Sequence, residues 1–185
     1  KAAALALACL LATPYVLDYD LAVLAIAIAF LTKHGFTSGF RAYEITLAVE
    51  EKLAAFKGCE AALLFSSGFQ ANATVIPALA GVMGSAGGKV GAGDTANATA
   101  IFSDALNHAS IVHGCRVARA RTQVFRHNDL QHLDDLLRQH AGRKLILTES
   151  VFSMDGDRAD LPALVRLAER HGAALYVDEA HASGV

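Results

Sequence analysis

Four short polar clusters in this sequence carry residue types that could bind or transform a ligand. In the most informative of them, the apolar run 173–177 leads directly to Asp178, and His181 follows three residues later. Apolar runs of this length are typical of buried strands in a parallel sheet. Ligands collect beyond the carboxyl ends of such strands, so we expect Asp178 and His181 at a ligand-binding rim. The alternative is an aspartate that only caps the following turn.

The other three clusters also follow predicted strands. Residues 66–68, Ser-Ser-Gly, open a helix whose free backbone amides and positive dipole end suit a phosphate group. An ordinary helix-capping serine is the alternative there. His108 follows the strand 100–103 and could stack on a flat ligand, although a lone histidine is more often a packed or capping residue. The fourth cluster is 149–153, which contains Glu149 and Ser153.

Taken together, the clusters predict one site for an anionic, aromatic ligand. Asp178 would pair with a ring nitrogen and hold it protonated, which keeps the ring an effective electron sink. A carboxylate beside a cation favours the charged pair. His181 and Ser153 could then hydrogen-bond a phenolic oxygen on the same ring.

Composition and missing motifs argue against several other functions. The net charge is −2 and no run of basic residues exists, so nucleic acid is a poor candidate partner. No His-Glu-x-x-His or two-His-one-carboxylate spacing appears, so we expect no metal site. Residues 84–90 fail as a phosphate loop because Val90 stands where a magnesium-binding Ser or Thr is needed. Three scattered cysteines without a Cys-x-x-Cys pair favour a reducing compartment; we expect the cytoplasm and leave an organelle open.

The elements that must position these residues alternate along the chain. Strands are expected at 61–65, 100–103, 124–125, 144–148 and 173–177, and helices at 42–57, 69–79, 109–119, 129–140 and 161–171. This alternation predicts an α/β fold with a mostly parallel sheet flanked by helices on both faces. The first helix is amphipathic, with Ile45, Val49, Leu53 and Phe56 on its inward side and Gly58 after its end.

The sequence divides into two predicted parts. Residues 1–37 form an apolar segment of unclear role, in which the runs are short or broken by Pro14. A signal-peptide core, a buried or arm-like helix and a membrane-associated segment all remain open for residues 1–31. Residues 38–185 form one partial domain with a Gly/Ala-rich insertion at 81–98. Because the chain begins at Lys1 and stops just after its most site-like segment, we expect a fragment.

Four ordered motifs within 38–185 resemble the α-oxoamine synthases, which are pyridoxal-phosphate enzymes. The motifs are SGFQAN at 67–72, SDALNHAS at 103–110, TESVFSMDGD at 148–157 and VDEAH at 177–181. The resemblance implies an incomplete large domain of the aspartate-aminotransferase fold (fold type I). It also implies a homodimer that condenses an amino acid with an acyl-CoA and releases CoA and CO2.

At matching positions, the resemblance implies residues that bind pyridoxal 5'-phosphate. The backbone amides of Gly68 and Phe69, which follow Ser67, would hold the phosphate. His108 would stack on the pyridine ring and contact the substrate. Asp178 would bind the ring nitrogen. His108 and Asp178, together with His181 near the ring oxygen, are the catalytic residues that the resemblance implies.

Three further matches complete the expected site, and two departures limit it. His181 and Ser153 would hydrogen-bond the ring oxygen, and Glu149 matches a family acid near the cofactor. The family's Schiff-base lysine stands in a Ser/Thr-rich motif some tens of residues after the Asp-x-x-His strand, and none of the six lysines here has that context. Thr46 stands where the family has a histidine. The 185 residues alone are therefore expected to be inactive.

The expected substrates follow from the subfamily whose motifs are most similar to those of this sequence. The motifs are most similar to members that join L-alanine to a pimeloyl thioester (pimeloyl-CoA), giving 8-amino-7-oxononanoate for biotin biosynthesis. The Gly/Ala insertion is similar to that of plant and algal members. Formation of 5-aminolevulinate or 2-amino-3-ketobutyrate and a serine palmitoyltransferase-like reaction are alternatives. A lysine-free, non-catalytic subunit that dimerises with an active chain is an alternative of another class.

Overall fold

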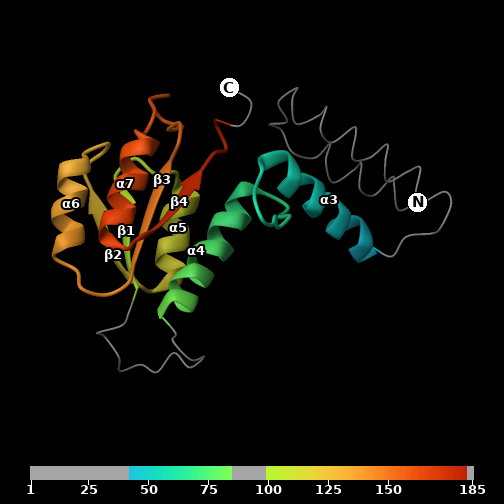
Figure 1. The fold of residues 1–185 in the computed structure, drawn as a ribbon, viewed down its shortest axis with the longest axis horizontal. Helices are drawn as coiled ribbons and strands as arrows, with labels where there is room; N and C mark the ends of the chain where they lie inside the picture. The colour runs from blue at the N-terminus through green and yellow to red at the C-terminus, as the bar shows by residue number, and fades with distance from the viewer. Residues whose placement is uncertain (1–41, 85–98, 183–185) are drawn as a thin grey trace. The chain divides into compact units, whose positions relative to one another are not determined.

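The computed structural model describes residues 42–84 and 99–182, in two compact units that divide between Ser67 and Gly68. The described part of the first unit contains helix α3 (Ala42–Lys57) and the irregular segment 58–67. The second unit contains every strand of the described residues and helices α4 to α7 (Figure 1). The predictions for residues 1–37 and for most of the insertion fall outside the described residues.

Helix α3 confirms the first predicted helix, residue for residue. Gly58 ends it with a φ of +66°, a left-handed conformation that glycine adopts without strain. The amide of Cys59 then donates to the carbonyl of Ala54 at 3.0 Å, which satisfies one of the last helical carbonyls. The predicted apolar face is partly wrong, because Phe56 is 66% exposed in the structure.

The predicted strand at 61–65 is wrong. These residues are irregular and pair with no strand in the described part of the chain. The backbone amide of Leu64 donates to the side chain of Glu50 on α3, at 2.8 Å, instead of to a neighbouring strand. Leu63 is 73% exposed. An apolar run forms a strand only where a neighbour satisfies its backbone groups, and the described residues supply no such neighbour for 61–65.

The predicted parallel sheet is confirmed in the second unit. Its four strands are parallel in the order β2 (Arg121–Phe125), β1 (Ala100–Asp104), β3 (Lys144–Glu149) and β4 (Ala174–Asp178). Their carboxyl ends therefore meet at one edge of the sheet. Asp104, Glu149 and Asp178 are the last residues of β1, β3 and β4, so three acids reach this edge.

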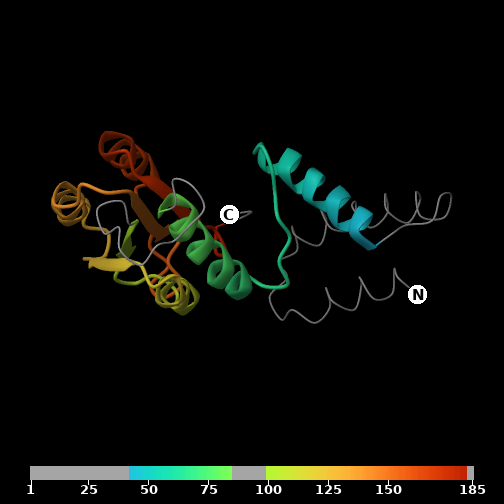
Figure 2. The ribbon, with the colours of Figure 1, turned by 90° about the horizontal axis from the view of Figure 1, so that it is seen from below.

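Helices cover both faces of the sheet, as predicted. Figure 2 shows α4 (Gly68–Gly84) and α5 (Ala109–Ala118) on one side, with α6 (Leu130–Arg138) and α7 (Leu161–His171) on the other. Helix α4 begins close to the expected position but continues five residues past Leu79, with Pro77 inside it. Across 42–84 and 99–182, every helix is too short or too polar to cross a membrane.

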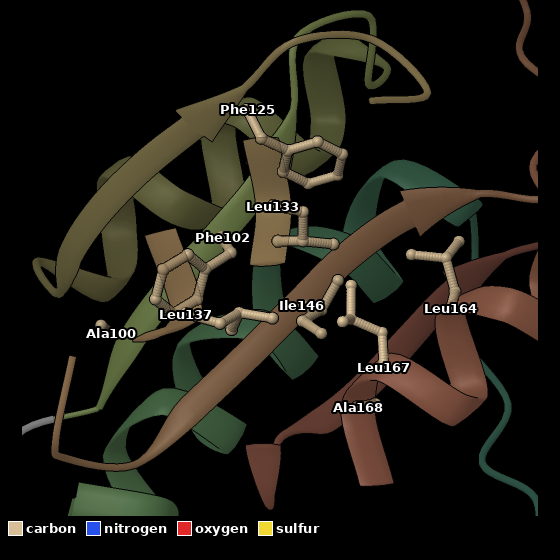
Figure 3. Close-up of a cluster of buried hydrophobic side chains, with 9 residues drawn as sticks. All are labelled: Ala100, Phe102, Phe125, Leu133, Leu137, Ile146, Leu164, Leu167 and Ala168. Atoms are coloured by element: carbon tan, nitrogen blue, oxygen red, sulfur yellow. The ribbon is translucent and has the colours of Figure 1, made fainter. Parts of the chain in front are cut away.

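Alternating side chains of β1 and β3 build a core on each face. Phe102 and Ile146 point toward α6 and α7, where they meet the leucines of those helices (Figure 3). Ile101 and Leu147 point to the opposite face and pack with Ile76 of α4. All four strand residues are fully buried, as expected for central strands of a parallel sheet covered on both sides.

Candidate active site

The carboxylate of Asp178 is held in a fixed orientation at the end of β4. Its Oδ1 atom accepts a hydrogen bond from the backbone amide of Ala180 at 2.9 Å. Its Oδ2 atom accepts one from the side-chain amide of Asn72, on α4, at 2.7 Å. The carbonyl of Asp178 accepts from the amide of Ser150 at 3.0 Å, which ties the end of β4 to the loop after β3. A half-buried carboxylate held from two sides is suited to bind a cation or a protonated ring nitrogen.

Asn72 is a buried amide that uses each of its hydrogen-bonding atoms. Besides Asp178, its Nδ2 atom donates to the hydroxyl of Ser110 at 2.8 Å. Its Oδ1 atom accepts from the hydroxyl of Tyr176 at 2.6 Å. Burial, together with the negative charge of Asp178, raises the pKa of the Tyr176 hydroxyl, so this group stays a donor at neutral pH. Asn72 lies within the motif at 67–72, and the sequence alone indicated no role for it.

His108 caps the start of α5 and presents its ring to solvent. Its Nδ1 atom accepts from the amide of Ser110 at 3.2 Å and lies 2.7 Å from the hydroxyl of the same residue. The backbone amide of His108 donates to Glu149 Oε1. The capping role that the sequence left open is therefore real. Because the side chain is exposed, its ring also remains available for stacking on a ligand.

Glu149 joins two of the predicted clusters. Its side chain is 2% exposed, and its second carboxylate oxygen accepts from the backbone amide of Ser153 at 3.2 Å. The side-chain amide of Asn107 makes a second connection to β3, because it donates to the carbonyl of Leu147 at 2.9 Å. The loop that contains His108 is thus fastened to the end of β3, and Glu149 serves these two loops as a buried acceptor.

The remaining predicted residues are at the surface. Gly68 and Phe69 form the exposed first turn of α4, where backbone amides lack partners inside the helix. The hydroxyl of Ser153 and the ring of His181 have no hydrogen-bond partner among the described residues. Hydrogen bonds therefore link Asp178, His108, Glu149 and the backbone of Ser153, whereas none within the described residues links His181 to them. Ser67 belongs to the first unit.

The third strand-end acid, Asp104, has a structural partner that the sequence did not indicate. It is 3% exposed and accepts from the ring of His127 at 2.8 Å, and the other ring nitrogen lies 2.8 Å from Asp157. Burial alone would lower the pKa of His127, but the hydrogen bonds and charges of Asp104 and Asp157 outweigh it and raise that pKa. His127 thus bridges the end of β1 to the loop that follows Ser153.

The donor set at the edge of the sheet fits pyridoxal phosphate. Asp178 offers a fixed carboxylate for a ring nitrogen. His108, which is connected to Asp178 by hydrogen bonds through Asn72 and Ser110, offers an exposed aromatic ring. Ser153 and His181 offer unpaired polar groups, within the described residues, for a ring oxygen. Lys144 does not suit a Schiff base, since it is 9% exposed and its Nζ atom donates to the carbonyl of His171 at 3.3 Å. Nowhere in 42–84 or 99–182 do three His, Cys, Asp or Glu residues group to hold a metal ion.

Comparison with known proteins gives matches over most of the chain. The family model described as aminotransferase class I and II matches residues 19–185. Two curated relatives named 8-amino-7-oxononanoate synthase come from Gluconacetobacter diazotrophicus and Geobacter sulfurreducens, and each is 54% identical. Their alignments span 140 and 144 residues and cover 74% and 77% of this chain. They cover 33% of each relative, so the chain spans about a third of the length of these relatives.

Solved structures give the same picture. A serine palmitoyltransferase from S. paucimobilis with bound PLP matches with a TM-score of 0.65 and 33% identity, covering 88% of this chain and 39% of that one. The 8-amino-7-oxononanoate synthase of Francisella tularensis matches with a TM-score of 0.58 and 29% identity, covering 82% of this chain and 39% of that one. The sheet and its flanking helices therefore share the fold of these two solved structures, which confirms the predicted fold class.

Proposed function

The chain belongs to the aminotransferase class I and II family, and on that premise we propose that its protein is a pyridoxal-phosphate-dependent acyltransferase. The proposed reaction joins L-alanine to a pimeloyl thioester and yields 8-amino-7-oxononanoate, CoA and CO2. The observation that carries the cofactor assignment is the Asp178 carboxylate, which ends a parallel strand and is fixed by Asn72 and Ala180. A homodimer in a reducing compartment is part of the proposal.

Each proposed residue acts on a defined part of the bound group. When bound, pyridoxal phosphate supplies an electron sink that stabilises negative charge at the α-carbon of the amino acid. Asp178 keeps a proton on the ring nitrogen, because an ionised carboxylate favours the charged form of its partner. The amides of Gly68 and Phe69, at the start of α4, bind the phosphate. His108 covers one face of the ring from the start of α5.

Two further residues set the orientation of the ring. Ser153 and His181 hydrogen-bond the ring oxygen, and Glu149 holds the loop of Ser153 through its backbone amide. Because Glu149 is buried and already accepts from two backbone amides, its proposed role is to position the loops and not to exchange protons. Preorganised groups of this kind cost no rearrangement when the reaction occurs.

The substrate assignment rests on sequence identity to relatives with different names. Curated relatives named 8-amino-7-oxononanoate synthase are 54% identical to this chain, whereas the serine palmitoyltransferase of S. paucimobilis is 33% identical. The second candidate function is nevertheless a serine palmitoyltransferase-like reaction, because the TM-score of 0.65 to that enzyme exceeds the 0.58 to the synthase of F. tularensis.

A substrate panel with the full-length gene product tests the proposal. The purified protein is loaded with pyridoxal phosphate and offered L-alanine with pimeloyl-CoA, or L-serine with palmitoyl-CoA. We expect CoA release and a product with the mass of 8-amino-7-oxononanoate from the first pair. Turnover of the second pair alone would favour the second candidate. Cofactor binding without turnover of either pair would contradict both and favour a non-catalytic subunit.

The cofactor assignment has its own test. Asp178→Ala should abolish the visible absorbance of bound pyridoxal phosphate and lower the affinity for it. Asp135→Ala is the matched control, since Asp135 is an exposed acid on α6 whose carboxylate accepts from Gln131. A full-length wild-type protein that shows no such absorbance after loading would contradict the proposed function.

A further inference from the structure

A continuous set of side-chain hydrogen bonds connects Asp178 to His108. Asn72 donates to Asp178 at 2.7 Å and to Ser110 at 2.8 Å, and the Ser110 hydroxyl lies 2.7 Å from the His108 ring. The two middle residues are buried, with 3% exposure for Asn72 and 1% for Ser110. The relay, defined as these four residues, joins strand β4, helix α4 and the start of α5.

The chemistry of the four groups fixes the direction of each hydrogen bond. An ionised carboxylate only accepts, so the amide nitrogen of Asn72 must face Asp178. The same nitrogen donates its second hydrogen to the hydroxyl of Ser110, and the hydroxyl of Tyr176 donates to the amide oxygen of Asn72. The Ser110 hydroxyl therefore accepts from Asn72 and keeps its own hydrogen for His108 Nδ1.

The same logic sets the tautomer of His108. Its Nδ1 atom accepts from the backbone amide of Ser110 at 3.2 Å, and it faces the hydroxyl hydrogen of that residue. With Nδ1 occupied as an acceptor, the neutral ring carries its proton on Nε2. A ring held in one tautomer presents one defined polar edge and a fixed plane to a ligand.

We propose that Asn72 and Ser110 are positioning residues, which orient the Asp178 carboxylate and hold His108 as its Nε2–H tautomer. The inference rests on the proposed function and deepens it, because the two ends of the relay are the residues proposed to meet the ring nitrogen and the ring face. Burying an amide and a hydroxyl is unfavourable unless both are satisfied, and here their bonds lead to the two site residues.

Two substitutions in the full-length, cofactor-loaded protein test the relay. Ser110→Ala removes a single oxygen, so the start of α5 keeps its backbone bond to His108. Thr99→Val is the matched control, because it removes a hydroxyl that is also buried but has no partner in the described residues, at the other end of β1. Asn72→Ala removes the bond to Asp178 directly, and thermal unfolding shows whether each variant remains folded.

The readouts are the His108 tautomer and the affinity for pyridoxal phosphate. Nitrogen-15 NMR of labelled histidine reports the tautomer, and the His108→Asn variant assigns the signal. We expect Nε2–H in the wild type and in Thr99→Val, and a measurable fraction of the Nδ1–H tautomer in Ser110→Ala, because only the longer 3.2 Å bond from the backbone amide then holds Nδ1 as an acceptor. Losing a hydrogen bond to a charged group should weaken cofactor binding at least tenfold in folded Asn72→Ala.

The outcomes separate the two levels of the proposal. An unchanged tautomer and unchanged cofactor affinity in Ser110→Ala would overturn the relay while leaving the proposed function intact. Equal effects of Ser110→Ala and Thr99→Val would also overturn it, since the hydroxyl would then matter only for packing. A wild-type protein that binds no pyridoxal phosphate would overturn the proposed function, and the tautomer measured in that sample would still decide the relay.

Discussion

Gly114 on α5 faces the backbone of Asn72 on α4, and we expect Gly114→Ala to force these helices apart. A Cβ atom added at Gly114 would lie 2.7 Å from the carbonyl oxygen of Asn72, and 3.0 Å and 3.1 Å from two side-chain carbons of Ile76. Ordinary contacts begin at 3.4 Å, so relief requires a movement of about 0.7 Å, the difference between 2.7 and 3.4 Å. The nearest atom belongs to the backbone, so no side-chain rotation can provide that movement.

The magnitude follows from two opposing effects. Overpacking a well-packed core costs roughly 1–3 kcal/mol, and a backbone clash belongs in the upper half of that range. Replacing glycine by alanine inside a helix contributes about 1 kcal/mol in the other direction. We therefore expect Gly114→Ala to lower the free energy of unfolding by about 1–2 kcal/mol. Gly81→Ala, on α4, is the matched control, because an added Cβ there meets nothing within 4 Å.

Urea unfolding followed by circular dichroism measures both variants. Gly81→Ala should be more stable than the wild type by about 0.5–1 kcal/mol, so the two variants should move the unfolding midpoint in opposite directions. The displaced Asn72 backbone should also weaken cofactor binding in Gly114→Ala but not in Gly81→Ala. A Gly114→Ala protein as stable as Gly81→Ala would refute the argument from close helix packing.

Two further predictions concern ionisable groups. Because the pKa of His127 is raised above its usual value of about 6.5, its ion pairs contribute their full stability below that pH and lose it as the pH rises through the raised pKa. The free energy of unfolding should therefore differ more between wild type and His127→Gln at about pH 6 than at about pH 9; an equal difference at both would contradict the ion pairs. Cys115 is buried and its pKa is raised to about 11, whereas Cys59 is exposed. Iodoacetamide should modify Cys59 in the folded protein and Cys115 only after unfolding, as peptide mass spectrometry can check; early labelling of Cys115 would contradict its burial.

Much of the second unit could be predicted because its local signals agree with its tertiary structure. Helix α7 occupies 161–171, as expected, and both of its ends have chemical causes. The side chain of Asp160 accepts from the amide of Ala163 at 3.0 Å, and Gly172 follows with a φ of +59°. Strands β1 and β3 are apolar runs buried on both faces, so length and composition identified them.

Other elements could not be predicted because their structure depends on distant partners. Strand β2 was expected at 124–125 but begins at Arg121, since pairing with β1 extends it over polar and exposed residues. Residues 61–65 have the composition of a strand without a neighbouring strand among the described residues. Composition reports what a segment could bury, whereas pairing decides what it becomes.

The family resemblance inferred from four motifs is confirmed by the family match and by the relatives named 8-amino-7-oxononanoate synthase. The expected cofactor is likewise the PLP bound in the solved S. paucimobilis relative. The roles of individual site residues stay predictions. Three of the four motifs could be found because they lie at the ends of β1, β3 and β4, where a parallel sheet gathers its ligand-binding residues. The fourth, at 67–72, opens α4 without a strand before it.

Asn72 shows why such motifs do not reveal the whole site. It lies 106 residues from Asp178 in sequence, and in the sequence alone it is one of two side-chain amides in a mostly apolar helix. Its role depends on the depth at which α4 packs on the sheet, which brings the amide beside β4. That depth depends in turn on Gly114, whose missing side chain lets the two helices approach. The orientation of a proposed catalytic carboxylate therefore depends on a glycine in a third element, a relation that tertiary packing alone creates.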